Sequence, residues 1–541
     1  MKGDYTPKIV EVLKTYNKEQ FGKDIVSGVI VAIIALPLSI ALALASGVSP
    51  EQGLYTAIFA GFVIALLGGS RVQISGPTAA FATIVAGIVA EKGIMGLATA
   101  TVMAGIILII MGLLKFGQLL KYIPYTIVTG FTSGIAITII IGQIKDFMGL
   151  TFTHSPIESM EKLKECFLTI GTTNYLALLV GVISLAVLII WPRINAKIPA
   201  SLIAVLVGIA VVKLGNLEVN TIGSLYEISN QFPMPQLPSF NLELVQSLLP
   251  DAFTIAILAA IESLLSSVVS DGMIGDKHNP NAELIAQGAG NITSAIFGGI
   301  PATGAIARTA ANVKNGGRSP ISGMVHSLVL VLILVVLMPY AALIPMPTIA
   351  AILFVVAYNM SEWREFLSLV KRSPKSDIAV LVVTFILTIV FDLVVAIEVG
   401  LLLAAVLLIK RMSDVADIQG WTYNSEDESL AQVPKGTLVY EVIGPMFFAA
   451  SEKFMSVYTD KNTKAIILRM RNVPALDVSA LRKLEELQRN CEKHDITLVL
   501  SHVVEQPYRV MEKSGFLCLV GDANICTNIE HALERAKVIC Q

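Results

Sequence analysis

The chain of 541 residues is 54% hydrophobic and only 15% charged, and its mean hydropathy is +0.72. This composition excludes an ordinary soluble globular protein, and repeated apolar runs of about 20 residues indicate a polytopic α-helical protein in a lipid bilayer. A net charge of −2 gives no indication of a nucleic-acid partner, and none is expected; five cysteines without metal-ligand spacing indicate neither a metal site nor a disulfide framework. No nucleophile–base constellation is evident, so we expect no enzyme and no cofactor.

The charge density changes near Lys410. Residues 412–541 carry 32 charged side chains in 130 positions, about a quarter, whereas the first 411 residues carry 48, about an eighth. A membrane domain followed by a soluble domain explains this shift. We therefore predict a cytoplasmic N-terminus (1–24), a transmembrane domain (25–411), a linker (412–433) and a cytoplasmic α/β domain (434–541).

Apolar runs and their breaks predict fourteen membrane segments. Basic residues test this count, because Lys and Arg concentrate in cytoplasmic loops. With the N-terminus inside, the inside loops carry basic residues such as Arg71 and Arg372, whereas the stretch 214–250 has none; Lys92 and the loop 144–173 are exceptions. The even count places both termini in the cytoplasm. The segments are 25–45, 50–68, 77–90, 94–115, 121–143, 174–191, 198–214, 250–271, 282–298, 302–313, 319–338, 345–360, 376–392 and 394–410.

Two stretches of the chain share one plan. Each runs through a Gly-Gly pair, at 68–69 and at 298–299, into a polar turn, "SGPTAA" or "IPATGAIARTAANV". The helices that follow, 77–90 and 303–313, are roughly 20 and 16 Å long, too short for a hydrocarbon core of about 30 Å. With seven segments in each half, the two repeats enter the membrane in opposite directions. Short segments at matching places of inverted repeats indicate a transporter site.

These short helices predict an anion site. Each follows extended chain, so its N-terminus lies near the midplane, with unpaired N–H groups and about half a positive charge. Two such ends facing each other would hold an anion without a buried lysine. The alternative is that Gly and Pro only kink ordinary spans, but the matching positions favour a site. The candidate residues are Gly76, Thr78, Ala79, Ala80, Thr303, Gly304, Ala305 and Ile306.

Residues 50–71, "PEQGLYTAIFAGFVIALLGGSR", closely resemble the signature of the SulP family of sulfate-permease anion transporters, apart from Gln52, where that signature has an aromatic residue. "ISGPTAAF", "AAIESLLSSVVSDGMIGDKHNPNAELIAQGAGN" and "FGGIPATGAIARTAANVKNGG" are similar to the family as well, so the resemblance covers essentially the whole chain. It implies a seven-plus-seven inverted repeat in which a core domain (segments 1–4 and 8–11) carries substrate past a gate domain (5–7 and 12–14), elevator-fashion. It also implies a C-terminal STAS domain and a homodimer in the plasma membrane.

Glu262 lies about eleven positions after Asp251, roughly 16 Å into its segment and close to mid-membrane. An ionised carboxylate is costly there, so the residue is a functional candidate, and proton uptake by it is expected. In the family an acid at this position is linked to cation coupling, and Glu is typical of proton-coupled members. An Asp followed by a hydroxyl one turn later is typical of the sodium-coupled bicarbonate branch. Here Ser266 follows Glu262 by four residues, so sodium is an alternative coupling ion. A structural Glu262 bonded within the core is the other alternative.

Three further positions belong to the expected substrate cavity. Arg308, in the second turn of the second short helix, resembles an arginine at the anion site of many animal members; alternatively, it points toward the inner mouth or pairs with Glu262. "LPLSIALA" faces the same cavity in the family pattern through Leu38 and Leu42. Many members have Gln in place of Leu38, so this more apolar wall leaves room for an anion with a carbon skeleton. We expect His326 to be packed or hydrogen-bonded rather than a proton relay.

The tail alternates strand-like runs, "GTLVYEVIG", "KAIILRM" and "ITLVLSHV", with the helical period of "VSALRKLEELQRNCEKHD", which predicts a small α/β domain. "VPALDVSALRKL" resembles the STAS loop that carries a phosphorylatable serine in bacterial anti-sigma antagonists, here matched by Ser479. A cytoplasmic regulator could act there. We favour the plainer interpretation that Ser479 belongs to a helix N-cap region.

The sequence therefore predicts a secondary active anion transporter, coupled to protons, for a small anion such as sulfate, bicarbonate or a four-carbon dicarboxylate. The alternatives are a sodium-coupled bicarbonate transporter and an uncoupled anion channel or exchanger. Glu262 argues against an uncoupled pore, which gains nothing from an acid beside its anion site. A STAS signalling protein with a membrane anchor is another class, but fourteen segments are far more than an anchor needs.

Overall fold

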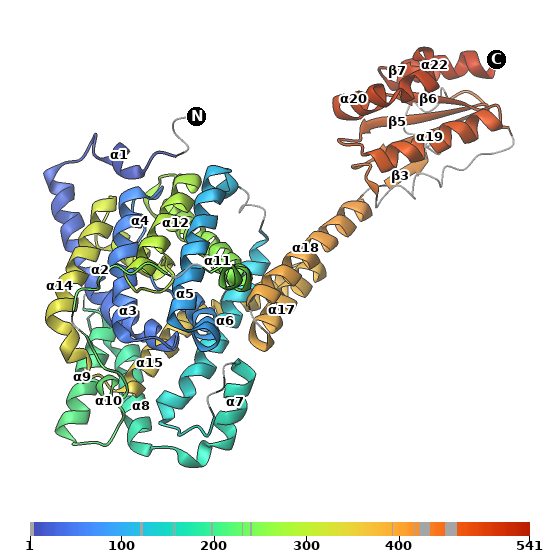
Figure 1. Cartoon of the computed structure of the whole chain (residues 1–541). Helices are drawn as coiled ribbons and strands as arrows, with labels where there is room; N and C mark the ends of the chain where they lie inside the picture. The colour runs from blue at the N-terminus through green and yellow to red at the C-terminus, as the bar shows by residue number, and fades with distance from the viewer. Residues whose placement is uncertain are drawn as a thin grey trace. The chain divides into compact units, whose positions relative to one another are not determined.

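The computed structural model describes residues 5–118, 123–154, 156, 158–195, 198–229, 231–238, 241–391, 393–415, 417–420, 433–448 and 462–541. The chain forms two compact units, Met1–Leu401 and Leu402–Gln541. The first unit is a bundle of helices, and the second contains a β-sheet with helices on its faces (Figure 1).

The first half of the bundle consists of long apolar helices that two features interrupt. A π-helical turn (Thr56–Ala60) separates α3 from α4, and α5 bends at Gly93, whose backbone is left-handed (φ 70°). The elements are α1 (Lys8–Val12), α2 (Lys18–Ala45), α3 (Pro50–Tyr55), α4 (Gly61–Leu67), β1 (Ser75–Gly76), a 3-10 turn (Ala79–Phe81), α5 (Ala82–Leu113), α6 (Tyr125–Met148), α7 (Ser159–Leu168), α8 (Tyr175–Ile194), α9 (Ala200–Leu214) and α10 (Ile222–Leu225).

The second half follows the same plan with a short strand in the corresponding place. Its elements are α11 (Leu242–Ile274), α12 (Pro280–Ile296), β2 (Thr303–Gly304), α13 (Ile306–Lys314), α14 (Pro320–Ala341), α15 (Met346–Met360), α16 (Trp363–Arg372), α17 (Lys375–Val390) and α18 (Leu393–Val415).

Helix is present in all fourteen expected segments. Within the described residues, seven helices are long and apolar enough to cross a membrane: α2, the run α3–α4, α5 with its preceding 3-10 turn, α6, α8, α11 and α14; α9 is apolar but shorter. A loop was expected between segments 77–90 and 94–115, but α5 runs through this position. The chain only bends there, because Gly93 adopts the left-handed conformation and helical turns resume directly after it.

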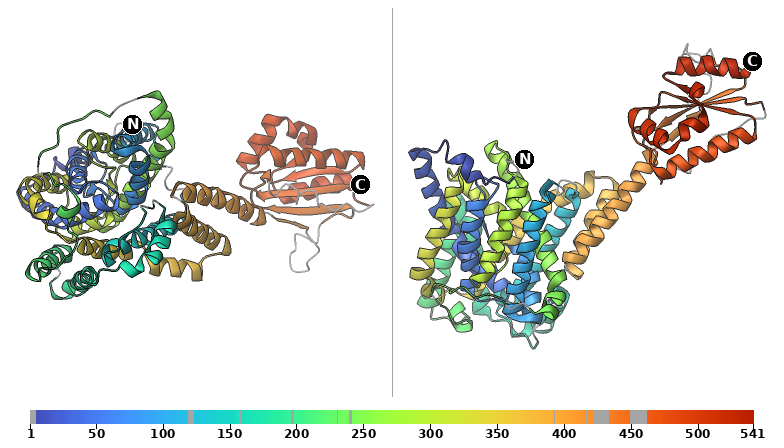
Figure 2. Two further views of the ribbon diagram at one scale, coloured as in Figure 1. Left: turned by 60° about the horizontal axis from the view of Figure 1, so that its bottom comes forward. Right: turned by 45° about the horizontal axis from the view of Figure 1, so that its top comes forward.

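The helices of the first unit sort into two groups by their packing. In one group α11 and α12 pack along α5, and α14 packs along α2 and α4. In the other, α15 and α17 pack along α6, and α8 packs between α15 and α9. Each group takes helices from both halves of the chain, as an inverted repeat requires, and their long helices run side by side in both views of Figure 2. The groups correspond to the segments expected for a core bundle and a gate bundle.

Glycines allow the closest approach within the core bundle. A Cβ atom added to Gly288 of α12 would lie 2.4 Å from the carbonyl oxygen of Gly105 in α5, and one added to Gly105 would lie 2.7 Å from the Gly288 oxygen. Such direct backbone contact provides van der Waals energy between helices where lipid supplies no hydrophobic driving force.

The second unit is an α/β domain whose sheet has the strand order β3-β4-β5-β6-β7. β3 pairs antiparallel with β4, and the other neighbours are parallel. The helices α19 and α22 pack against the sheet, whose strand residues alternate between two apolar clusters. The elements are β3 (Asp417–Gly420), β4 (Thr437–Ile443), β5 (Ala465–Asn472), α19 (Val478–Lys493), β6 (Thr497–Ser501), α20 (Glu505–Ser514), α21 (Phe516–Val520), β7 (Ile525–Cys526) and α22 (Ile529–Cys540).

The strands and the helix expected in the tail occur as β4, β5, β6 and α19. The sheet also contains β3, which lies within the expected linker 412–433, while residues 421–432 of that linker lie outside the described residues. A four-residue strand without alternating apolar residues gives little sequence signal, and its pairing with β4 depends on the rest of the sheet.

Gly288→Ala should lower the thermal stability of the purified protein, because the added methyl group has no room against α5 and overpacking costs about 1–3 kcal/mol. Gly142→Ala in α6 is the matched control, since nothing lies within 4 Å of a Cβ at that position. Thermal unfolding in detergent should show a lower midpoint for Gly288→Ala alone. Equal midpoints would contradict the close contact between α12 and α5.

The α/β domain should fold without the membrane unit. A fragment of residues 434–541 should be soluble and unfold cooperatively in urea, and a fragment of residues 416–541 should unfold at higher urea because β3 covers the edge of β4. An insoluble shorter fragment would argue against a boundary at 434. Identical urea midpoints would argue against a stabilising role for β3.

Candidate anion-binding site

Two short strands, one from each half of the chain, cross at the starts of the two short helices. β1 and β2 pair antiparallel, with Ser75 opposite Gly304 and Gly76 opposite Thr303. β1 leads through the 3-10 turn into α5, and β2 leads into α13. The crossover therefore brings the N-terminal ends of both short helices to one place in the core bundle.

The short helices begin slightly later than the sequence predicts. Thr303 and Gly304, expected in the first helical turn, form β2, and α13 starts at Ile306. On the other side, Thr78 is still extended and the 3-10 turn starts at Ala79. The strand pairing explains the shift, because it gives these residues backbone partners that the start of a helix lacks.

Neither helix start has a side-chain cap. Thr78 and Ala305 occupy the N-cap positions, yet no side-chain oxygen at either position accepts a helix N–H. The Thr309 N–H donates to the Ala305 oxygen at 2.8 Å, which closes the first turn and leaves the preceding N–H groups at the free end of α13. Ile306 is 43% exposed, so accessible surface reaches this end. Two uncapped ends at one crossover suit an external acceptor such as an anion.

The Thr78 hydroxyl bonds to an acid instead of its own helix. Its Oγ1 donates to Oε2 of Glu262 at 2.9 Å. Glu262 is half-buried and lies in the interior of the 33-residue helix α11. This hydrogen bond joins an intramembrane carboxylate directly to the N-cap residue of the first short helix.

Arg308 of α13 reaches back to the other helix start. Its Nη2 donates to the Pro77 carbonyl oxygen, and the residue is 1% exposed. Its Nε and Nη1 have no hydrogen-bond partner within the described residues. No ion pair joins Arg308 to Glu262 in that part of the chain, so the alternative pairing is absent. A buried guanidinium with unused donors is costly unless it meets a negative charge, which makes this position favourable for an anion.

Glycines keep the crossover narrow. A Cβ at Gly76 would lie 2.7 Å from Nη1 of Arg308, and a Cβ at Gly304 would lie 2.5 Å from Nε2 of Gln73. Both glycines therefore allow side chains to lie directly against the strand backbone.

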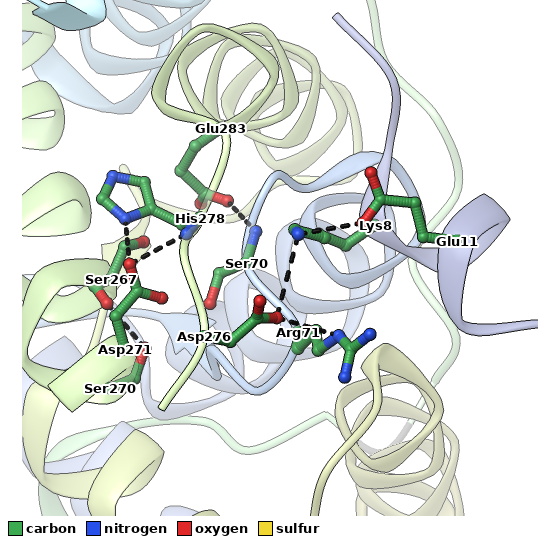
Figure 3. A network of polar contacts seen from close by, with 10 residues as sticks. All are labelled: Lys8, Glu11, Ser70, Arg71, Ser267, Ser270, Asp271, Asp276, His278 and Glu283. Atoms are coloured by element: carbon green, nitrogen blue, oxygen red, sulfur yellow. Dashed lines mark hydrogen bonds and ion pairs between the residues drawn. The ribbon is translucent and has the colours of Figure 1, made fainter. Parts of the chain in front are cut away.

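A buried carboxylate holds the chain that leads into β1. Glu283 of α12 accepts the backbone N–H groups of Gly69 and Ser70 at 2.9 and 3.2 Å, and the side-chain amides of Gln73 and Gln287 at 2.7 and 2.9 Å. Figure 3 shows the bond to Ser70. These four donors offset much of the free-energy cost of burying the acid. They also hold the segment before β1 against α12, in the second half of the chain.

Ion pairs join Arg71, in the segment before β1, and Lys8 of α1 to the loop between α11 and α12 (Figure 3). Nε of Arg71 lies 2.9 Å from Oδ2 of Asp276, and Nζ of Lys8 lies 3.7 Å from that oxygen. The loop is also bonded to the end of α11, where Oδ2 of Asp271 accepts the His278 backbone N–H at 2.8 Å and lies 2.7 Å from Nδ1 of the same histidine. The two halves of the chain are thus joined at the edge of the core bundle as well as at the crossover.

The other predicted cavity residues lie at different depths. Leu42 is 2% exposed and Leu38 is half-buried, both on α2. The Ser266 hydroxyl is 3.3 Å from Oγ1 of Thr309, to which it donates, rather than being bonded to Glu262. A sodium site shared by Ser266 and Glu262 would require this hydroxyl to change partner.

Four more predicted residues are buried. Ala79 and Ala80 form the first turn before α5, and the Thr303 hydroxyl donates to the Ala259 oxygen of α11 at 3.0 Å. His326 is fully buried, and neither ring nitrogen has a hydrogen-bond partner within the described residues. It is packed, as expected, but not hydrogen-bonded.

In the second unit, Ser479 is exposed in the first turn of α19. The N-cap is Asp477, whose Oδ1 accepts the Ala480 N–H at 2.8 Å. Ser479 therefore lies in the N-cap region without being the cap.

Two asparagines and a glutamate that support the crossover were not among the residues expected from the sequence. Nδ2 of Asn312 donates to the Val72 oxygen at 2.8 Å, and Asn291 bonds both the N–H and the oxygen of Ala302, at 2.8 and 2.9 Å. The sequence does hold a signal for such residues. Polar side chains such as Asn291 and Glu283 stand within apolar segments, where burying them costs free energy unless they are hydrogen-bonded.

Two family profiles match the chain. The Sulfate permease family matches residues 21–384, and the STAS domain matches residues 429–532. Together they cover most of the helical bundle and most of the α/β domain.

Individual proteins agree with these profiles. The putative sulfate transporter YvdB of Bacillus subtilis is 40% identical over 523 residues, covering 94% of this chain and 96% of its own. The bicarbonate transporter BicA of Picosynechococcus sp. is 30% identical over 537 residues, covering 95% and 94%.

Solved structures show the same fold. Murine Solute Carrier 26 family member A9, an anion transporter in the inward-facing state, matches with a TM-score of 0.88 at 20% identity, covering 99% of this chain and 94% of its own. The transmembrane domain of a cyanobacterial bicarbonate transporter BicA matches with a TM-score of 0.64 at 31% identity, covering 70% and 98%. The polytopic helical transporter fold with a C-terminal α/β STAS domain is thereby confirmed.

Ala305→Leu should weaken anion binding at least tenfold, because a longer side chain at the N-cap covers the free end of α13. Ala305→Gly is the matched control and should bind normally, since it removes bulk at the same position. Binding of radiolabelled sulfate and bicarbonate to detergent-solubilised protein measures the effect, with thermal unfolding to check the fold. Unchanged affinity in a folded Ala305→Leu protein would refute this placement of the site.

Proposed function

The chain belongs to the sulfate permease family of anion transporters, and we propose that it is a secondary active transporter that carries a small anion together with a proton. The anion binds between the uncapped starts of α5 and α13, and Glu262 carries the proton. The bundle of α2–α5 and α11–α14 moves with the bound anion past the bundle of α6, α8, α9, α15, α17 and α18.

One observation carries the placement of the anion. Arg308 is buried at the strand crossover with two donor nitrogens that no described residue engages, beside two helix starts that have no side-chain cap in the same part of the chain. Each of these groups gains from a negative charge at the same place. An anion that accepts N–H groups from both helix ends and lies near the guanidinium satisfies all three.

The bond between Thr78 and Glu262 supports coupling to protons. It places the carboxylate one hydrogen bond away from an N-cap residue of the proposed site. Two like charges about 6 Å apart at an effective dielectric near 20 repel by about 3 kcal/mol, roughly a hundredfold in affinity. Protonation of Glu262 removes that repulsion, so the anion and the proton bind together.

Sodium coupling is the second candidate. Ser266 lies one turn from Glu262 on α11, and the bicarbonate transporter BicA is a relative of this chain. The Ser266 hydroxyl bonds to Thr309 rather than to Glu262, which favours the proton. Both sulfate and bicarbonate remain candidate substrates, since relatives are named for each.

Glu262→Gln should bind the anion but lose uphill uptake driven by a proton gradient, because the amide imitates the protonated acid permanently. Exchange of labelled for unlabelled anion should survive, since exchange needs no net proton movement. Proteoliposomes with and without a pH gradient, tested with labelled sulfate, bicarbonate and a four-carbon dicarboxylate, provide the measurement and identify the anion. In the wild type, uptake should rise as the outside pH falls.

Glu51→Gln is the matched control, because Glu51 is also an acid buried in the core bundle, at 9% exposure, and no hydrogen bond or ion pair joins it to the crossover within the described residues. It should keep gradient-driven uptake. Accumulation by Glu262→Gln on a proton gradient would exclude Glu262 as the coupling group. A wild type that responds to sodium instead of protons would establish the second candidate.

A further inference from the structure

The helix α16 has an unusually sharp division between apolar and polar residues. Over "WREFLSLVKR", the apolar residues Trp363, Phe366, Leu367, Leu369 and Val370 fall on one side of a helix with 3.6 residues per turn. The other side holds Arg364, Glu365, Ser368, Lys371 and Arg372.

Only part of the apolar side is covered by protein. Phe366 packs against Phe385 of α17, with ring centroids 5.1 Å apart. At the turn before α16, the Ser133 hydroxyl of α6 donates to the Ser361 oxygen at 2.6 Å. Trp363 and Leu367 remain 43% and 45% exposed. The helix is therefore fixed to the gate bundle along one edge and leaves a tryptophan and a leucine uncovered beside it.

Basic residues border this uncovered apolar strip. Arg364, Lys371 and Arg372 are exposed, and none has an ion-pair partner within the described residues. The guanidinium of Arg364 lies over the Trp363 ring, with its carbon 5.4 Å from the centroid. Lys375, at the start of α17, adds a further exposed cation after the end of the helix. Glu362 and Glu365 lie at the start of α16, where acids complement the helix dipole, and Asp377 lies in the first turn of α17.

We propose that α16 lies in the membrane interface and binds the headgroups of anionic phospholipids. Trp363 and Leu367 would enter the boundary of the acyl chains, and Arg364, Lys371 and Arg372 would contact phosphate groups above them. Amphipathic helices with tryptophan on one face and basic residues on the other bind bilayers in this manner. An acidic protein partner would account for the charges, but it leaves the adjacent exposed Trp363 and Leu367 without a reason.

The position of α16 in the chain agrees with this placement. It joins α15 to α17, two helices of the gate bundle, and it contacts α6 of the same bundle. An interfacial helix there anchors that bundle to the lipid surface. The lipid contact itself depends neither on the identity of the transported anion nor on the coupling ion.

The fluorescence of Trp363 can report the lipid directly. The chain has three tryptophans, so Trp191→Phe with Trp421→Phe leaves Trp363 as the sole emitter. The full-length protein is reconstituted into vesicles of phosphatidylcholine and phosphatidylglycerol, in which one or the other lipid carries bromine on its acyl chains. Both brominated lipids should quench Trp363. Their relative quenching should show phosphatidylglycerol enriched about fivefold or more at α16, since each basic residue near an anionic surface contributes on that order.

Arg364→Gln with Lys371→Gln and Arg372→Gln should abolish the preference for phosphatidylglycerol while retaining quenching by both lipids. The matched control removes three exposed or partly exposed cations from α19 of the α/β domain, Arg482→Gln, Lys483→Gln and Arg489→Gln, and should keep the preference. Equal quenching by the two lipids in the parent protein would overturn the headgroup site. Absence of quenching by either lipid would overturn the interfacial position and leave a protein partner as the explanation.

Discussion

The need to satisfy interrupted backbone in apolar surroundings governs the first unit. A helix that stops inside a membrane protein leaves N–H and C=O groups that water cannot reach, and each unpaired group costs several kcal/mol. Here two interrupted segments satisfy one another, because β1 and β2 pair across the two halves. Asn291 and Asn312 bond to neighbouring backbone groups, and Glu283 bonds to the chain before β1. Several polar side chains of the core bundle thus complete this crossover.

The crossover also determines where positive potential accumulates. Helix starts that were capped by their own side chains would present little charge to a ligand. Thr78 directs its hydroxyl to Glu262, and Ala305 has none to offer, so both ends stay uncapped. Arg308 adds a full charge that only the Pro77 oxygen engages within the described residues. Gly76 and Gly304 are required because side chains of the other half occupy the space that a Cβ would fill.

Glycines bring helices into backbone contact in both helical bundles. In the core bundle, Gly105 and Gly288 do so between α5 and α12. In the gate bundle, a Cβ at Gly130 of α6 would lie 2.8 Å from the Leu381 oxygen of α17. The gate bundle also contains α16, whose Trp363 and Leu367 remain exposed beside basic residues.

Apolar runs, their breaks and the distribution of basic residues indicated the fourteen segments, because lipid imposes a length and a composition on spanning helices that local sequence must meet. Gly and Pro in "SGPTAA" and "IPATGAIARTAANV" likewise indicated where α5 and α13 begin inside the bundle, since backbone interruptions need such residues nearby in sequence. The partners across the crossover came only from the tertiary structure. Thr78 and Glu262 are 184 positions apart, and Arg308 and Pro77 are 231 apart, so no local pattern records their contact. The pairing of β3 with β4 and the true starts of the short helices were also decided by neighbours distant in sequence, because strand pairing supplies backbone partners that local propensity does not describe.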